Sequence, residues 1–357
     1  SEKPALPLVT TKGLQMIEKT LHGGQARLIY GQSCIASLRQ LESESIHCVV
    51  TSPPFWNLRN YCDHPSQLGL ETTPQEFVDN LVDVFREIHR VLRSDGTVWL
   101  NLGDTYASNG YPNNAKAGLN QRMFGDHHAD GRQSDDRARH VPSGEHGLKV
   151  KDLAGIPWRV ALALQADGWW LRQDIIWHKP NPMPESCTDR CTKSHEYIFL
   201  LTKSAKYYSE FGELKEPAVS GERFHGGYDA VMADGSKGHS RNGRDDPNNR
   251  ANWRNKRSVW TIASQSYHGA HFAVFPEEIP RLAIKAGSPI GGTVLDPFSG
   301  SGTTGKVALQ LGRNYIGLDV NEEYLDLALR RVDQFRSDSP TQEEDDGQET
   351  LFSGVDE

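Results

Sequence analysis

Cysteine is scarce in this chain, and its distribution excludes a scaffold held together by disulfides. Five cysteines occur among 357 residues, an odd number scattered from Cys34 to Cys191. Small secreted domains that depend on disulfides are cysteine-dense and carry cysteines in even numbers. We therefore expect reduced thiols in a reducing compartment.

Long apolar runs are also missing. No apolar stretch approaches the roughly 20 residues that span a bilayer, and residues 1–13 lack the apolar segment of a secretory signal. No internal repeat is present. We expect a soluble cytoplasmic protein without a membrane partner, and the 36% hydrophobic content is enough for a sizeable core.

Positive charge is not in excess, but its distribution is uneven. The formal net charge is −8, and residues 338–357 hold eight acids and no Lys or Arg, so the body of the chain is neutral. Residues 221–260 contain eight bases against five acids, a local net of +3. This segment is compatible with DNA and equally with a solvated loop of mixed charge. We predict an acidic disordered tail over residues 337–357.

Apolar segments alternate with helical patterns, which is typical of an α/β domain with a largely parallel sheet. Strands are predicted over residues 46–50, 97–102, 171–177, 196–201, 293–296 and 315–319. Helices are predicted from 74 to a stop at 94–96, over 153–166, over 302–311, and from a cap at Asn321 to about Val332. The first helix has a capping box, Thr73 with Glu76, and Pro74 in its first position.

Two polar segments without periodicity interrupt this pattern. Residues 105–150 are predicted to form a long mobile loop, and residues 209–258 an inserted subdomain. The predicted divisions are therefore an N-terminal extension (1–24), one half of the main domain (25–208), the insertion (209–258), the other half (259–336) and the tail (337–357).

A glycine-rich turn between a strand and a helix is the first candidate site. Residues 296–306 read Asp-Pro-Phe-Ser-Gly-Ser-Gly-Thr-Thr-Gly-Lys. Glycines allow close backbone approach, and free N–H groups at a helix start suit a polar ligand. As a phosphate-binding loop the segment fails, because Val307 stands where a Ser or Thr should hold Mg²⁺. Asp319, at the end of the next strand, can instead accept both hydroxyls of a ribose.

A proline-rich segment directly after the first strand is the second candidate site. Residues 51–56 read Thr-Ser-Pro-Pro-Phe-Trp. Two prolines remove two backbone donors and fix the direction of the chain, so the Pro53 carbonyl can point outward as an acceptor. A hydroxyl, a rigid carbonyl and an aromatic face can together hold a planar ring that bears an amino group. A structural proline turn capped by a core aromatic is the alternative.

The two segments together resemble the S-adenosylmethionine-dependent DNA amino methyltransferases, which modify the exocyclic nitrogen of cytosine or adenine. The resemblance covers about residues 25–335, and the proline segment precedes the glycine turn, as in the permuted beta class of that family. It implies a Rossmann-like mixed sheet with helices on both faces, a circularly permuted motif order, and a smaller inserted target-recognition region at residues 209–258.

The resemblance also assigns residues to the cofactor, S-adenosylmethionine. In the turn and at the ribose these are Asp296, Pro297, Phe298, Gly300, Gly302, Thr303 and Asp319. Residues 258–280 look like the segment that closes over the methionine part of the cofactor, with His271, Phe272 and Phe275 as contacts. Relatives often carry Asp at the position of Gln32, and an amide there can still hydrogen-bond an adenine edge.

The mechanism that the resemblance implies is direct methyl transfer to a base flipped out of the duplex. We expect the Ser52 hydroxyl and the Pro53 carbonyl to accept the two amino hydrogens, with Pro54 stiffening the segment. Phe55 is expected to stack on the base and Trp56 to form a side wall that contacts DNA. The chain contains no Pro-Cys dipeptide, so thiolate attack on ring carbon 5 has no candidate.

The base, the partners and the absence of a metal complete these expectations. In the family, Ser before Pro-Pro is associated more with cytosine N4, so Ser52 favours cytosine, with adenine N6 as the alternative. An RNA or protein-glutamine methyltransferase and a non-catalytic DNA-binding module are remoter alternatives.

Double-stranded DNA is expected to contact the basic residues Arg250, Arg254, Lys256 and Arg257. The family implies a homodimer and a bacterial or phage gene. Cys187, Cys191 and His195 lack a fourth zinc ligand, so no metal is predicted.

Overall fold

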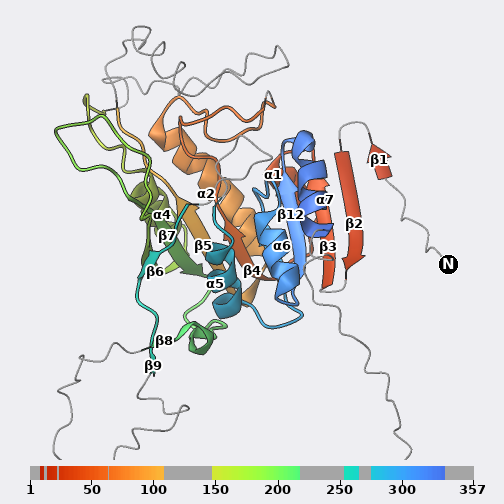
Figure 1. Ribbon diagram of the computed structural model, residues 1–357. Coiled ribbons are helices and arrows are strands. Elements are labelled where there is room, and N and C mark those ends of the chain that lie inside the picture. Colours follow the sequence, from red (N-terminus) through yellow and green to blue (C-terminus); the bar gives the residue numbers. More distant parts are fainter. Residues whose placement is uncertain are drawn as a thin grey trace, which may run out of the picture.

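A ten-stranded mixed sheet forms the frame of the molecule, with helices along it (Figure 1). The computed structural model describes residues 9–11, 14–21, 24–62, 64–107, 147–217, 253–264 and 275–333. Across the sheet the strands are β1 (Val9–Thr11), β2 (Leu14–Leu21), β3 (Gly24–Tyr30), β12 (Asn314–Asp319), β11 (Thr293–Asp296), β4 (Ile46–Thr51), β5 (Leu92–Leu102), β7 (His195–Thr202), β6 (Trp170–His178) and β10 (Val259–Thr261).

The central five strands are parallel. β3, β12, β11, β4 and β5 pair in that order with parallel registers, so their carboxyl ends meet at one edge of the sheet. β7 runs antiparallel between β5 and β6, and β10 lies parallel to β6. The sheet is therefore mixed, as expected.

The direction of strand order reverses between β11 and β4. From β11 the chain continues to β12 on one side, and from β4 it continues to β5 on the other. In open α/β sheets, ligands bind in the crevice outside the carboxyl ends at such a switch point. The two segments singled out in the sequence follow β4 and β11, which are paired neighbours at Cys48 and Val294. The fold thus joins the proline segment and the glycine turn although they lie far apart in the chain.

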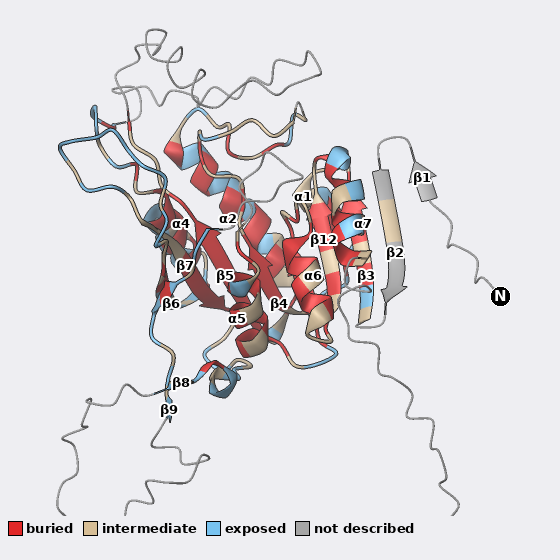
Figure 2. Cartoon of the chain, viewed as in Figure 1, coloured by how far each residue is buried: buried red, intermediate tan, exposed pale blue. Residues whose placement is uncertain are grey.

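The helices divide into two groups with separate cores. The helical elements are α1 (Cys34–Leu38), α2 (Pro74–Val91), α4 (Ile156–Ala166), η1 (Phe211–Leu214), α5 (Glu278–Gly287), α6 (Thr303–Gln310), η3 (Glu322–Tyr324) and α7 (Leu325–Asp333). The first three pack with Val49 of β4 in one apolar cluster, and α5, α6 and α7 pack with its neighbour Cys48 in another. Successive strand residues point to opposite faces, so each face of the sheet is covered by its own helices (Figure 2).

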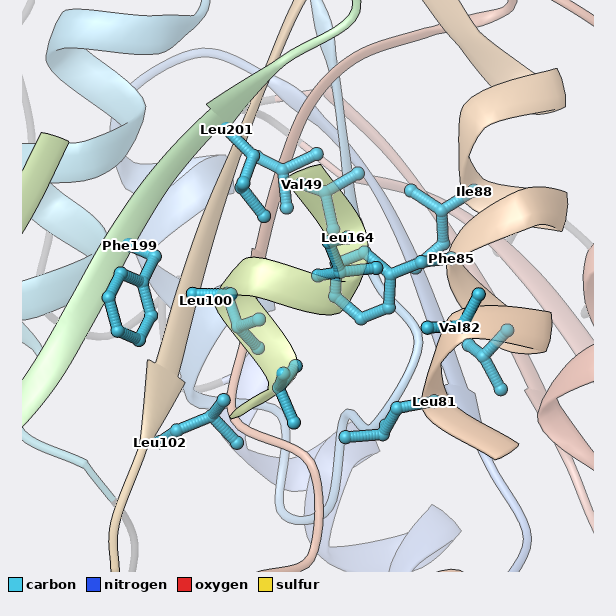
Figure 3. Packing of buried hydrophobic residues seen from close by; sticks show 14 of the residues in the cluster. Val49, Leu81, Val82, Phe85, Ile88, Leu100, Leu102, Leu164, Phe199 and Leu201 are labelled. Carbon is cyan, nitrogen blue, oxygen red and sulfur yellow. The ribbon is translucent and has the colours of Figure 1, made fainter. Parts of the chain in front are cut away.

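The packing between the sheet and α2 and α4 is wholly apolar at its centre. Figure 3 shows Val49 and Leu201 from the sheet beside Phe85 of α2 and Leu164 of α4, and all four side chains are fully buried. Complete burial of a side chain of this size stabilises the fold by about 1.5–3 kcal/mol. This core fixes β4 and α2, and with them the segment that joins the two elements.

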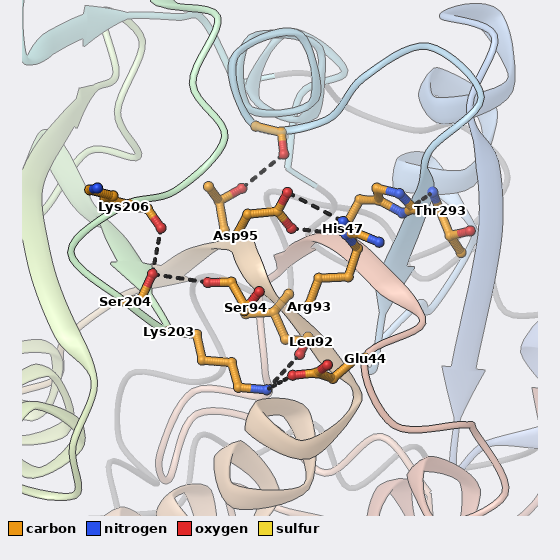
Figure 4. A network of polar contacts seen from close by, with 12 residues as sticks. Glu44, His47, Leu92, Arg93, Ser94, Asp95, Lys203, Ser204, Lys206 and Thr293 are labelled. Carbon is orange, nitrogen blue, oxygen red and sulfur yellow. Dashed lines mark hydrogen bonds and ion pairs between the residues drawn. The ribbon is translucent and has the colours of Figure 1, made fainter.

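Polar contacts hold the amino-end edge of the sheet, opposite the switch-point crevice. The Lys203 ammonium donates to the Leu92 carbonyl over 2.9 Å, the Ser204 hydroxyl donates to the Ser94 carbonyl over 3.0 Å, and the Thr293 N–H donates to His47 Nδ1 over 3.0 Å (Figure 4). The first two contacts tie the start of β5 to the segment that follows β7, and the third ties the start of β4 to the start of β11. The proline segment and the glycine turn lie at the opposite, carboxyl edge, where β4 and β11 end.

Most predicted elements are confirmed, and one boundary is wrong. α2 begins at Pro74 with the expected capping box, in which Thr73 and Glu76 exchange side-chain and backbone hydrogen bonds. The predicted stop at residues 94–96 is wrong: the helix ends at Val91, and β5 starts at Leu92. Pairing of Leu92 with Ile46 of β4 draws this segment into the sheet. Among the described residues, no helix is long and apolar enough to cross a membrane.

Two predicted divisions can be compared with the fold. Residues 9–11 and 14–21, assigned to the N-terminal extension, form β1 and β2 and widen the sheet next to β3. The ends of the predicted insertion are joined, because β8 (Glu216–Pro217) pairs antiparallel with β9 (Trp253–Arg254). Most of the insertion and of the predicted loop 105–150, and the tail 337–357, lie outside the described residues.

Candidate functional site

A cavity of about 450 Å³ lies at the switch point, within the range of about 300–1,000 Å³ typical of ligand pockets. Residues from both sequence segments line it together. They include Ser52, Pro53, Pro54 and Phe55 from the segment after β4, and Asp296, Pro297, Phe298, Gly300 and Thr303 from the segment after β11. Asp319, at the end of β12, and Phe275 line the same cavity. The structure therefore brings together most of the described residues that the sequence placed in one site, whereas Gln32, Trp56 and Gly302 do not line this cavity.

Ser52 lies at the head of a chain of hydrogen bonds across the sheet. Its hydroxyl donates to Asn101 Oδ1 of β5 over 2.9 Å. The Asn101 amide donates to Glu196 Oε2 over 3.0 Å and to the Tyr197 carbonyl over 3.1 Å, both on β7. Glu196 also pairs with Lys179. Sequence patterns gave no signal for Asn101, Glu196 or Lys179, all of which line the cavity.

Phe55 occupies its place because a glycine lies beneath it. A Cβ added to Gly103, just after β5, would lie 2.3 Å from Cε2 of the Phe55 ring. No side chain fits at that distance, so a glycine at 103 is what allows the ring to lie on the end of β5. The ring is half-buried and lines the cavity. This position suits the expected stacking of a planar ligand on Phe55.

Trp56 corrects an expectation. Its side chain is 1% exposed and belongs to the apolar cluster beneath α2. Its indole Nε1–H donates to the Glu71 carbonyl over 2.9 Å. The prediction that Trp56 forms a wall of the base site and contacts DNA is wrong, because the core buries the ring. The alternative reading of the proline segment, a turn capped by a core aromatic, holds for this one residue.

The glycine turn adopts a conformation that needs glycine at two positions. Gly300 and Gly302 have φ values of 50° and 79°, in the left-handed region that L side chains rarely occupy. Gly302 also packs closely on α7, where an added Cβ would lie 3.1 Å from the Ala328 Cα. The turn passes directly into α6, which begins at Thr303.

Asp296 organises the turn and links it to the proline segment. The side chain is 2% exposed. One carboxylate oxygen accepts from the Thr51 hydroxyl over 2.8 Å and from the Phe298 N–H over 3.1 Å, and the other accepts from the Thr304 hydroxyl over 2.7 Å. Burial raises the pKa of Asp296 to about 6 against these hydrogen bonds, which lower it. Contact between Asp296 and a cofactor stays a prediction.

Asp319 is held in place and still faces the cavity. One carboxylate oxygen accepts from the Gly300 N–H over 2.7 Å, and the other accepts from the Asn321 N–H over 2.9 Å. Each carboxylate oxygen has a second acceptor site, so Asp319 keeps acceptor capacity for two neighbouring hydroxyls, and its contact with a ribose stays a prediction. Burial raises its pKa to about 6, and the nearby Asp296 carboxylate adds to the shift.

Two sets of buried polar side chains support the turn, and sequence reasoning missed both. The Tyr30 hydroxyl donates to Ser299 over 2.8 Å, and Ser299 is 2.7 Å from the Tyr315 hydroxyl. From α7, Arg331 donates to the hydroxyls of Ser301 and Thr303 over 2.7 and 2.6 Å. These contacts join residues distant in sequence, so no local pattern announces them.

The remaining predicted residues divide into three groups. Gln32 is half-buried, its Nε2 has no hydrogen-bond partner, and it is not among the described residues that line the cavity.

The basic residues proposed to contact DNA differ in their surroundings. Arg254 pairs with Glu216 over 2.9 Å, and Lys256 lies 4.0 Å from the same carboxylate, while Arg257 is exposed. His271, Phe272 and Arg250 lie outside the described residues. Contacts of the basic residues with DNA stay predictions.

Comparisons with known proteins agree with this geometry. A family model described as DNA methylase matches residues 46–330. The Type II methyltransferase M.SmaI of Serratia marcescens is 45% identical over 296 residues, which cover 83% of this chain and 87% of the relative.

Two solved structures share the fold. The PvuII DNA methyltransferase, described as cytosine-N4-specific, has a TM-score of 0.55 at 18% identity and covers 86% of each chain. A protein of Thermus thermophilus, solved in complex with S-adenosyl-L-methionine, has a TM-score of 0.51 at 22% identity, covering 86% of this chain and 93% of its own. At these identities the likeness establishes the architecture, a Rossmann-like mixed sheet.

Proposed function

This chain belongs to the DNA methylase family and is an S-adenosylmethionine-dependent DNA methyltransferase; within that activity we propose that it methylates the N4 amino group of cytosine. The observation that supports the proposal is the meeting of two oxygen acceptors with the glycine turn in one cavity. Ser52 and Pro53 line that cavity together with Gly300 and Asp319.

The residues of the cavity fit the cofactor. Asp319 can accept the two ribose hydroxyls, and the turn at Gly300 allows close approach of a ligand to the backbone. Phe298 and Phe275 supply apolar surface. When bound, S-adenosylmethionine supplies an electrophilic methyl group on a positively charged sulfur. The acids Asp296 and Asp319 favour that charge when they are ionised.

The acceptors act on the nitrogen of the target. An exocyclic amino group is nearly planar and a poor nucleophile, because its lone pair is shared with the ring. Hydrogen bonds from its two hydrogens to Ser52 Oγ and the Pro53 carbonyl localise that pair and aim the nitrogen. Phe55 stacks on the flipped ring and offsets part of the unstacking cost of a few kcal/mol. Ser52 is an acceptor here and removes no proton, because the amino nitrogen becomes acidic on methylation and loses its extra proton to water.

Cytosine is favoured by the neutral hydroxyl at Ser52. In this family of methyltransferases, Ser before Pro-Pro is associated more with methylation of cytosine N4, and Asp or Asn at that position more with methylation of adenine N6. The name of the PvuII enzyme, which shares only the fold, states the same specificity for that protein.

The partner and the setting follow from the family. DNA is the substrate, and we infer that it is double-stranded and is read by residues 209–258, whose ends are joined through β8 and β9. The Serratia relative supports a bacterial cytoplasm. A homodimer is inferred from the family resemblance alone, and sedimentation equilibrium at micromolar concentration tests it through the mass of the particle.

One experiment tests the proposed function. DNA free of amino-methylated bases is incubated with the protein and methyl-labelled S-adenosylmethionine, digested to nucleosides and identified by mass. Label in N4-methylcytidine derivatives is the expected result. Label in N6-methyl-2′-deoxyadenosine would overturn the assignment to cytosine and show that adenine N6 is the target. Label that enters RNA or protein glutamine and not DNA would contradict it.

A further inference from the structure

The buried amide of Asn101 has its orientation fixed by its partners. The side chain is 3% exposed and lies on β5 between β4 and β7. Its Nδ2 faces two acceptors, Glu196 Oε2 at 3.0 Å and the Tyr197 carbonyl at 3.1 Å. A carboxylate and a carbonyl have no proton to donate. A flipped amide would place an oxygen against both, so Oδ1 must be the atom that faces Ser52.

Glu196 is itself held in place. Its second oxygen pairs with the Lys179 ammonium, and the Nζ atom of that ammonium lies 4.3 Å from the centre of the Trp177 ring. The side chains of both partners are mostly shielded, with 21% of Lys179 and 15% of Glu196 exposed. The carboxylate is therefore anchored from its far side, which keeps its other oxygen available to Asn101.

This arrangement commits the single proton of the Ser52 hydroxyl. Because Oδ1 of Asn101 can only accept, Ser52 donates to it over 2.9 Å. The lone pairs of Ser52 Oγ are then left for a ligand in the cavity. A hydroxyl free to rotate would instead turn its proton toward the cavity for part of the time, where it would oppose an N–H donor.

We propose that Asn101 is a positioning residue, anchored by Glu196 and Lys179, that fixes Ser52 as a hydrogen-bond acceptor and so selects bases that carry an amino group. The inference rests on the proposed role of Ser52. A base with a carbonyl at the same position, such as uracil or thymine, would place oxygen against oxygen. A site built to pair with N–H groups rejects such a base, because buried polar atoms are left unpaired.

The test compares two replacements that keep the branched shape of the asparagine side chain, Asn101→Asp and Asn101→Leu. Aspartate keeps an oxygen acceptor for Ser52 but adds a negative charge beside Glu196, whereas leucine removes the acceptor without a charge. We expect Asn101→Leu to lower kcat by about 100-fold, the loss that misplacement of a reacting group produces. Asn101→Asp should retain clearly more activity. Dissociation constants for S-adenosylmethionine, measured by calorimetry, should match the parent protein in both variants.

A purely structural role for Asn101 predicts the opposite ranking, since a second buried carboxylate beside Glu196 disturbs the fold more than leucine does. Thermal unfolding of each variant shows which is more disturbed. Leucine at least as active as aspartate would overturn the proposal.

The double variant Ser52→Ala/Asn101→Leu adds a second readout. If Asn101 acts through Ser52, the leucine change should cost no further activity once Ser52 is gone. A full additional 100-fold loss in the double variant would also overturn the inference. Failure of the proposed role of Ser52 looks different, because Ser52→Ala alone would then stay active, and failure of the proposed function would show as label in a nucleoside other than N4-methyl-2′-deoxycytidine. An inactive Ser52→Ala protein beside a fully active Asn101→Leu protein would refute the positioning role only.

Discussion

The two halves of the cavity are built on different chemistry. The half that we propose holds the cofactor, the cofactor half, at the ends of β12 and β11, carries Asp319 and Asp296, two shielded acids whose pKa values are raised to about 6. In the half that we propose holds the base, the base half, at the ends of β4 and β5, the neutral hydroxyl of Ser52 is joined by a hydrogen bond to the neutral amide of Asn101. This division fits the proposal that a charged cofactor binds on one side and an uncharged base on the other. Binding of the cofactor should therefore depend on charge, and transfer on the direction of hydrogen bonds.

We expect Ser52→Ala to show the largest difference between an effect on methyl transfer and an effect on cofactor affinity. Loss of one of two acceptors for the amino group should lower kcat by about 10³-fold, as when one preorganised hydrogen-bonding group is removed from an active site. Affinity for S-adenosylmethionine should not change, because Asp319 and the glycine turn remain. Single-turnover methyl transfer and calorimetry measure the two quantities. Unchanged turnover would remove Ser52 from the mechanism.

Asp319→Asn should give the converse result. The amide keeps a similar shape but loses the charge and one acceptor oxygen, so the dissociation constant for the cofactor should rise by about 10–100-fold, as for a hydrogen bond to a charged group. At saturating cofactor, kcat should stay within a few-fold of the parent. A variant with normal affinity would show that Asp319 serves only to hold Gly300 and Asn321.

Gly103→Ala should affect the base half alone, and less strongly. The new methyl group would lie 2.3 Å from Cε2 of Phe55, so the ring must move away from the end of β5. Transfer should fall by about 10-fold through misplacement of the base, with normal cofactor affinity. Gly212→Ala is a matched control, because nothing lies within 4 Å of its added Cβ. Equal activity of the two variants would argue against stacking on Phe55.

The smallest expected effect is a pH dependence confined to the cofactor half. A positive sulfonium favours ionised acids, and Asp296 and Asp319 take up protons as the pH falls through about 6. Affinity for S-adenosylmethionine should thus be highest above this pH and fall by about 5-fold between pH 7 and pH 5. S-adenosylhomocysteine, which lacks the sulfonium charge, should lose less. Equal pH profiles for the two ligands would contradict the electrostatic part of the comparison.

Local sequence signals predicted more of the cofactor half than of the base half. The turn at Gly300 and the acid at Asp319 stand beside strand ends that short apolar runs reveal, and the capping box at Thr73 and Glu76 likewise lies within a few residues. The hydrogen bonds of Asn101 join residues 49 and 95 positions apart, so nothing local marks it. Trp56 was misassigned because an aromatic beside two prolines looks the same whether the core or a ligand covers it.

The most direct test of this account is a crystal structure with S-adenosylhomocysteine bound. The ribose hydroxyls should meet Asp319, and the sulfur should face Ser52 Oγ and the Pro53 carbonyl across one continuous cavity. A ligand bound elsewhere, or a sulfur turned away from those two oxygens, would contradict it.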